Sequence, residues 1–173
     1  NRVKIEYQKS DGLYGYSTTG DLTDNSQIDI TFSEFSNNDG YGINFGAGAN
    51  AVQNNIHIIN NRILRNDLGG VLLNTCINCS LTNNAIAYND STGVTISALG
   101  GSPFSRSNLL KNNEFDSNKG TQLLIGTAYN TESYNDYFIA NTPSVGIPAV
   151  TKMIDLSLTV ANMTIEKADH RVK

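Results

Sequence analysis

The stretch NNIHIINNRILRNDLGGVLL, residues 54–73, carries the clearest indication of the fold. Apolar residues two positions apart occur at Ile56 and Ile58, and again at Val71 and Leu73 after a polar turn. Side chains two apart point to the same face of a strand. A helix would instead repeat its apolar residues every 3.6 positions, and no such period is sustained before residue 143. The stretch therefore indicates short strands joined by tight corners.

The same template recurs along the chain: an apolar anchor, two residues, an asparagine, a short turn and an apolar-x-apolar strand. The copies are FSNNDGYGINF (35–45), ILRNDLGGVLL (63–73), IAYNDSTGVTI (86–96) and FDSNKGTQLLI (115–125), with weaker copies at 7–17 and 138–148. Self-similarity at such a period is typical of a solenoid. The anchors are Tyr7, Phe35, Ile63, Ile86, Phe115 and Phe138, spaced by 28, 28, 23, 29 and 23 residues.

Alignment of the copies gives columns of apolar residues. One column reads Ile43, Val71, Val94 and Leu123, and parallel columns run through Ile30, Ile58, Leu81 and Leu110 and through Phe45, Leu73, Ile96 and Ile125. We therefore predict an all-β fold, a right-handed parallel β-helix of about six rungs of 23–29 residues, over residues 1–143. Residues 144–173 are predicted to form a strand-rich final rung or a cap, because Ile154, Leu156, Leu158 and Val160 alternate with polar residues.

Asparagines and glycines mark the predicted corners. Side-chain amides can bond from one rung to the next, and asparagine tolerates the left-handed conformation of tight corners. Glycines are expected where φ is positive. The turn asparagines are Asn38, Asn66, Asn89 and Asn118, a second column comprises Asn60, Asn83, Asn112 and Asn135, and the turn glycines are Gly42, Gly70 and Gly93.

A column of carboxylates follows the turn asparagines. It reads Asp11, Asp39, Asp67 and Asp90 and ends at Lys119. On successive rungs these groups would lie about 4.8 Å apart. Neighbouring carboxylates at that spacing suit a retaining glycosidase, and alternate rungs suit an inverting one. Asp39, Asp67 and Asp90 are therefore the candidate catalytic residues, and the same cluster could hold Ca²⁺. Turn formation is the simpler interpretation of an Asp in these positions.

Other polar side chains are candidates for binding sugar. Arg65 could neutralise an acidic sugar or Asp67, and Tyr41, Asn44 and Asn74 are expected to contact substrate. Two further pairs share columns on adjacent rungs: Asp29 with His57, and Glu34 with Arg62. Asp29 and His57 could act as an acid–base pair, and surface salt bridging is the simpler interpretation of these contacts.

The cysteine pair predicts neither a metal nor a redox site. Cys76 and Cys79 form one CxxC without a second pair, and the two histidines lie at no zinc-ligand spacing from it. A redox CxxC is expected at a helix start, whereas this one lies between strands. We interpret Cys79 as a small core residue and Cys76 as a loop residue.

Composition excludes some classes of partner. Charged residues make up 16% of the 173 residues, and the net charge is −4. Nucleic-acid binding requires a basic surface, so it is not expected. No apolar run reaches the roughly 18 residues that span a bilayer. The chain opens at Asn1, already within a strand-like pattern, so we expect it to be a piece of a longer protein.

The repeated pattern of residues 54–73 resembles the pectin-lyase-like superfamily of right-handed β-helices over roughly residues 1–143. The superfamily includes pectate lyases, polygalacturonases and phage tailspike depolymerases. The Gly-His-Gly and Arg-x-Lys motifs of polygalacturonases are missing. The polar outer surface with scattered tyrosines looks most like a tailspike. That resemblance implies a homotrimer on a virion or extracellular surface, with polysaccharide as the partner.

Two classes of function stay open. The first is an enzyme, a glycoside hydrolase or polysaccharide lyase, that acts through the Asp column. The second is a non-catalytic carbohydrate-binding or structural segment of a larger spike or surface protein. The sequence does not specify the sugar.

Overall fold

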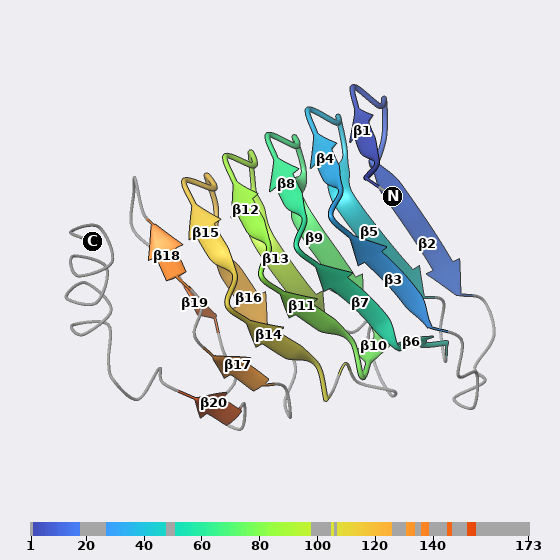
Figure 1. Ribbon diagram of the computed structural model, residues 1–173, viewed down its shortest axis with the longest axis vertical. Coiled ribbons are helices and arrows are strands. Elements are labelled where there is room, and N and C mark those ends of the chain that lie inside the picture. Colours follow the sequence, from blue (N-terminus) through green and yellow to red (C-terminus); the bar gives the residue numbers. More distant parts are fainter. Residues whose placement is uncertain are drawn as a thin grey trace.

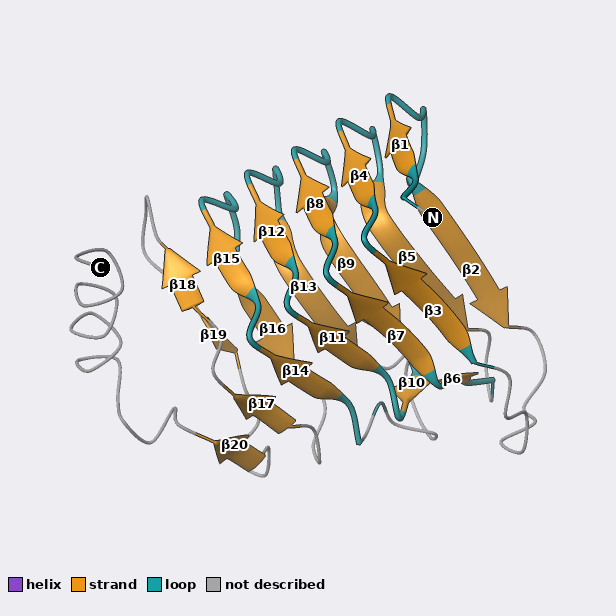
Figure 2. Cartoon of the chain, in the orientation of Figure 1, coloured by secondary structure: helices purple, strands orange, loops and turns teal. Residues whose placement is uncertain are grey.

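In the computed structural model the chain winds into a stack of short parallel strands (Figure 1). Figure 2 shows the described residues as strands joined by short turns, with no helix among them. Accordingly, the described part of the chain contains no helix long and apolar enough to cross a membrane. The structure describes residues 2–17, 27–47, 51–97, 105 and 107–125, and the backbone of the strands at 131–133, 136–138, 145–146 and 152–154.

Three six-stranded sheets form the sides of the stack, and the chain visits sheets A, B and C in turn. Sheet A contains β1 (Lys4–Glu6), β4 (Glu34–Ser36), β8 (Arg62–Leu64), β12 (Ala85–Ala87), β15 (Glu114–Asp116) and β18 (Asp136–Phe138). Sheet B contains β2 (Leu13–Ser17), β5 (Tyr41–Ala47), β9 (Gly69–Asn74), β13 (Thr92–Ser97), β16 (Leu123–Ile125) and β19 (Val145–Gly146). Sheet C contains β3 (Ile28–Thr31), β7 (Ile56–Ile59), β11 (Ser80–Thr82), β14 (Leu109–Lys111), β17 (Thr131–Ser133) and β20 (Lys152–Ile154). A further pair joins β6 (Gln53–Asn54) to β10 (Cys76–Ile77). The predicted all-β parallel β-helix is therefore confirmed.

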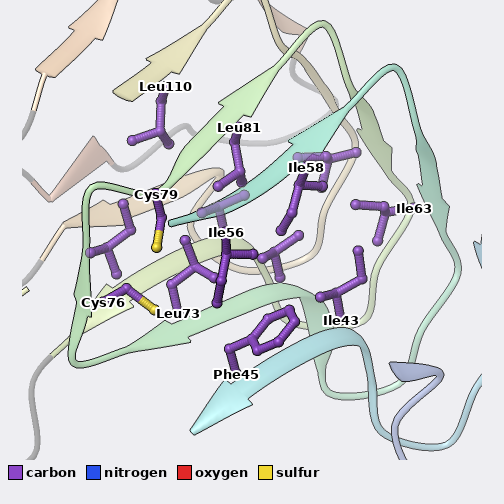
Figure 3. Packing of buried hydrophobic residues seen from close by; sticks show 14 of the residues in the cluster. Ile43, Phe45, Ile56, Ile58, Ile63, Leu73, Cys76, Cys79, Leu81 and Leu110 are labelled. Atoms are coloured by element: carbon purple, nitrogen blue, oxygen red, sulfur yellow. The ribbon is translucent and has the colours of Figure 1, made fainter. Parts of the chain in front are cut away.

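Strand register confirms the predicted apolar columns. Val71 pairs with Ile43 on one side and with Val94 on the other, and Val94 pairs with Leu123. All four side chains are fully buried. Burial of one such side chain stabilises the fold by about 1.5–3 kcal/mol. Because each apolar side chain lies on its equivalent in the next rung, one continuous core fills the stack (Figure 3).

The turn asparagines form a buried ladder, as the repeat predicts. The backbone N–H and the Nδ2 of Asn38 both donate to Oδ1 of Asn66, and Asn66 does the same to Asn89 and Asn89 to Asn118, at 2.8–3.2 Å. The Nδ2 of Asn66 also reaches the Phe35 carbonyl oxygen, at 3.2 Å. Each amide therefore satisfies backbone groups that the corner would otherwise leave buried without partners.

A second ladder lies one residue beyond its predicted place. Asn60, Asn83 and Asn112 have φ values of 58°, 57° and 53°, so they form the left-handed corners, as expected. Asn135, the fourth member of that column, lies outside the described residues. The bonds between rungs are made by the next asparagines instead, because these side chains turn inward. The buried ladder comprises Asn61, Asn84 and Asn113, and Ser33 donates its N–H to Asn61.

The turn glycines are required for space, not for positive φ as predicted. Among the described residues, the glycine with positive φ is Gly69, at 150°. A Cβ on Gly42 would lie 2.5 Å from Cγ2 of Ile63 and 2.8 Å from Nδ2 of Asn66. Gly70 and Gly93 are crowded in the same way by the adjoining rung. These glycines let the corner backbone approach the core and the asparagine ladder.

The outermost copies of the template have a different register from the predicted one. The residue that stacks on Phe35 is Ile5, so Tyr7 is not the anchor. Tyr137, rather than Phe138, pairs with Phe115. Of the C-terminal segment 144–173, the structure describes β19 and β20, which continue sheets B and C. Its role as a final rung or a cap stays a prediction.

Candidate functional site

Three of the four predicted carboxylates lie in one column, and the fourth, Asp11, does not. The N–H of Asp67 bonds to the Asn38 carbonyl oxygen and that of Asp90 to the Asn66 carbonyl oxygen, which places Asp39, Asp67 and Asp90 on successive rungs. The N–H of Asp39 bonds to the Gln8 carbonyl oxygen, so the first rung contributes Lys9 to this column, and Asp11 lies elsewhere.

Lysines close both ends of the column. Lys9 Nζ lies 3.1 Å from Asp39 Oδ2, and Lys119 Nζ lies 2.8 Å from Asp90 Oδ2. Asp39 and Asp90 each keep 46% of their side-chain surface exposed. We call the solvent-exposed row of Asp39, Asp67 and Asp90 the ridge. Like charges on such an exposed row repel only weakly, and the two lysines offset part of that repulsion. The three carboxylates therefore form a solvent-exposed ridge with a lysine at each end.

Arg65 lies on the corner beside this ridge. Its guanidinium carbon is 5.5 Å from the centre of the Tyr88 ring, a cation–π contact. The Tyr88 hydroxyl donates to Asp116 Oδ2 at 3.1 Å, and this bond raises the pKa of Tyr88. Arg65 thus contacts the tyrosine of the next rung.

Two exposed tyrosines lie on the outer face of sheet B. Tyr14 and Tyr16, two apart on β2, are 58% and 53% exposed. Their ring centres are 6.1 Å apart and their planes differ by 19°. A Cβ on Gly46 of the adjacent strand would lie 3.2 Å from Tyr16 Cδ2 and 3.8 Å from the Tyr14 hydroxyl. Both side chains therefore lean over Gly46, which leaves room for them.

Asp11 is held beside this pair rather than in the carboxylate column. Its Oδ1 accepts the Tyr41 N–H at 2.6 Å, and its Oδ2 accepts from Asn44 Nδ2 at 2.8 Å. Burial, with the nearby Asp11 charge, raises the pKa of Tyr41. Asn44 pairs in register with Tyr14. The structure thus brings together two of the predicted substrate-binding residues, Tyr41 and Asn44, and adds Asp11 to them.

The remaining predicted site residues lie apart. Asn74 is 8% exposed, and its Oδ1 lies 3.4 Å from the hydroxyls of Thr75 and Ser97. His57 pairs in register with Asp29, but its Nδ1 lies 2.7 Å from the Ser80 hydroxyl. These contacts hold both side chains within the stack, so Asn74 and His57 have structural roles here.

The two cysteines are both core residues, which corrects the prediction that Cys76 lies in a loop (Figure 3). Burial and the hydrogen bond to Cys79 raise the pKa of Cys76 well above its ordinary value. The same thiol–thiol bond lowers the pKa of Cys79, whose Sγ lies 3.4 Å from the Ile77 carbonyl oxygen. Within the ranges that the structure describes, no three His, Cys, Asp or Glu side chains group to hold a metal ion.

A family comparison accounts for nearly the whole chain. The family model described as "Periplasmic copper-binding protein (NosD)" matches residues 5–166. The chain belongs to the NosD family. That family has the pectin-lyase-like parallel β-helix fold, in agreement with the register above. No curated protein and no solved structure gives a significant match.

Local sequence places Tyr14 and Tyr16 on one face of a strand, because they lie two positions apart. The structure adds that this face points outward and that both rings lean over Gly46 of the adjacent strand. One usable signal existed: Leu13 and Ile43 are 30 residues apart, and that register would have placed Asp11 level with Tyr41.

Proposed function

We propose that this NosD-family β-helix binds glycan chains through the outer face of sheet B. The observation that carries the proposal is the tyrosine pair, Tyr14 and Tyr16, whose nearly parallel rings are more than half exposed. Tyrosine combines an apolar ring with a hydroxyl, and only two torsions must be fixed on binding. The C–H face of a sugar ring can pack on such a surface while its hydroxyls bond at the rim.

Polar groups beside the pair support the same function. Asp11 is fixed by Tyr41 and Asn44, so its carboxylate is pre-organised at the edge of the aromatic surface. A carboxylate that is already oriented loses little entropy when it accepts hydrogen bonds from sugar hydroxyls.

Cleavage through Asp39, Asp67 and Asp90 stays a prediction. Their spacing of about one strand, roughly 4.8 Å, is compatible with paired catalytic carboxylates. Their exposure and their lysine partners favour a solvated ridge over an acid–base pair, since a catalytic acid usually needs a buried setting. We therefore assign binding, rather than hydrolysis or lysis, to the described residues.

The copper in the family's description does not fit the thiols present. Copper(I) is bound by soft thiolates. Cys76 is enclosed in the core, and its raised pKa keeps it protonated. Its nearest polar partners are Cys79 and, at 3.9 Å, the Asn74 carbonyl oxygen. No copper role is derived from this pair.

The family's description as periplasmic supports a location outside the cytoplasm for this chain. The narrower predictions of a tailspike, a virion location and a homotrimer have no support from the family match and stay predictions.

A glycan array followed by titration tests the proposal. Tyr14→Ala together with Tyr16→Ala should weaken glycan binding by about 1–3 kcal/mol, from roughly 0.5–1.5 per aromatic contact, which is about 5- to 150-fold in Kd. Tyr7→Ala, which removes a tyrosine that is 70% exposed at another corner, is the matched control. Glycan binding that survives the double substitution unchanged would refute the proposal. Asp39→Asn and Asp67→Asn in a reducing-end assay test cleavage separately.

A further inference from the structure

A groove of about 380 Å³ crosses the outer corner between sheets C and A over the first three rungs. Strand register explains its shape, because Lys4, Glu34 and Arg62 stack in one outward column. The residues two positions earlier form the facing wall. The lining includes Arg2, Phe32 and Asn60 on one wall and Lys4, Glu34 and Arg62 on the other.

The groove is cationic in a chain that is acidic as a whole. Three cationic side chains line the groove with one carboxylate, Glu34, and with Glu6 bonded to Lys4 one positive charge stays in excess, whereas the chain carries −4. Glu34 lies 3.2 Å from Arg62 and 3.7 Å from Lys4, and Lys4 also bonds Glu6 at 2.7 Å. Among the described residues, Arg2 has no ionic partner. Arg62 donates one of its five N–H groups to Glu34. Both guanidinium groups therefore have N–H donors with which to bind an anion.

Phe32 lies at a corner of this groove where the following rungs have an asparagine. It has a φ of 52° and is 56% exposed. The equivalent corners in the next three rungs are Asn60, Asn83 and Asn112, a residue type that adopts positive φ more easily. Tyr7 and Tyr88 are also exposed aromatic residues with positive φ, but Phe32 differs from them because it lines the groove beside Arg2 and Arg62.

We propose that this groove binds a carboxylate-bearing sugar unit of an acidic glycan, with the carboxylate between Arg2 and Arg62 and the ring face on Phe32. The planar guanidinium of arginine can donate two parallel hydrogen bonds to the two oxygens of a carboxylate. An aromatic ring face can pack against the C–H side of a sugar ring. The proposal rests on the proposed function only in taking the ligand to be a glycan, since the groove involves none of the residues of the tyrosine pair.

Titration of uronate trisaccharides against the whole chain tests the assignment. A panel of galacturonate, glucuronate and mannuronate trisaccharides is compared with neutral galactotriose and with acetate and phosphate. We expect the uronates to bind, the neutral trisaccharide to bind this groove at least tenfold more weakly, and uronate affinity to fall as salt rises. Arg2→Gln with Arg62→Gln should weaken uronate binding about tenfold or more. Lys119→Gln, which removes a cation from the ridge, is the charge control.

Phe32→Asn separates binding from folding. It restores the residue type of the other rungs, so the melting temperature should stay or rise while uronate affinity falls severalfold. Equal affinity for uronate and galactotriose, unchanged affinity in the double arginine variant, or equal binding of free acetate or phosphate would overturn the proposal. Uronate binding that depends on the arginines and survives loss of Tyr14 and Tyr16 would support the groove. Glycan binding that depends on the tyrosines, with no uronate binding that depends on the arginines, would uphold the proposed function and overturn the groove proposal.

Discussion

Adjacent asparagines in the same corner should differ sharply in their contribution to stability. Asn83 is exposed and only provides a left-handed corner, with φ 57°. Asn84, the next residue, is 1% exposed and belongs to the inner ladder. Its Oδ1 accepts the Asn61 N–H at 2.9 Å, and its Nδ2 donates to the Ile58 carbonyl oxygen at 2.8 Å and to Asn113 Oδ1 at 3.0 Å.

Asn84→Ala removes both the acceptor oxygen and the donor nitrogen by which this side chain bonds to the rung of Asn61. The buried N–H of Asn61 loses the acceptor recorded for it, and the Ile58 carbonyl oxygen loses a donor. A buried polar group left without its partner costs about 1–3 kcal/mol. The unpaired Asn61 N–H and the lost bond to the Ile58 carbonyl oxygen, which keeps its place in the sheet, together give a loss of about 2–4 kcal/mol, which for a chain of this size lowers Tm by roughly 4–16 °C. Asn83→Ala should cost about 1–2 kcal/mol, because alanine adopts the left-handed conformation less easily.

Equilibrium urea unfolding and thermal melts of the two variants measure the difference, and Asn83→Gly, expected to be close to the parent, is the backbone control. If Asn84→Ala lost no more free energy of unfolding than Asn83→Ala, the ladder would not contribute as argued. Water that fills the vacated space and bonds to Asn61 would produce that result.

Three further perturbations test other parts of the structure. Gly70→Ala places a Cβ in hard contact with the Gly93 carbonyl oxygen and should lower unfolding free energy by about 1–3 kcal/mol in urea titrations; an unchanged midpoint would show that the corner has room. Cys76 should not react with a thiol reagent until denaturant is added, because its side chain is fully buried; rapid reaction in the native state would contradict the burial. Lys119→Ala should cost at most about 1 kcal/mol, since its bond to Asp90 is exposed, and the loss should shrink in high salt; a larger, salt-independent loss would contradict a solvated ridge.

The charge balance of the ridge depends on which residue of the first rung lies beside Asp39. With Asp11 in the column, four like charges would face each other with a cation at one end only. With Lys9 in its place, the column has a cation at each end, and Asp11 is free to bind Tyr41 and Asn44. The local sequence SDG near residue 11 imitates the NDG turn at Asp39, but the actual register is fixed by Ile5 and Leu13 in the core.

The parallel β-helix, its inward apolar columns and the Asn38–Asn118 ladder could all be predicted from the repeat in the sequence. Each rung repeats the same burial pattern, and a period-2 strand allows one face to be apolar in only one register. The inner ladder was missed because Asn60 and Asn61 are identical in type, and only the handedness of the corner decides which side chain turns inward.

The positions of the candidate sites follow from the way the rungs stack on one another. The tyrosine pair needs Gly46 from the neighbouring strand, and the cationic groove joins residues 2–4, 32–34 and 60–62. The repeat aligns Glu34 with Arg62, but Ile5 rather than Tyr7 stacks on Phe35, so the repeat alone does not bring Arg2 and Lys4 beside them. These segments meet because rungs of different length still stack with their apolar residues in register, so the loops absorb the differences and the outward side chains are brought together by the core.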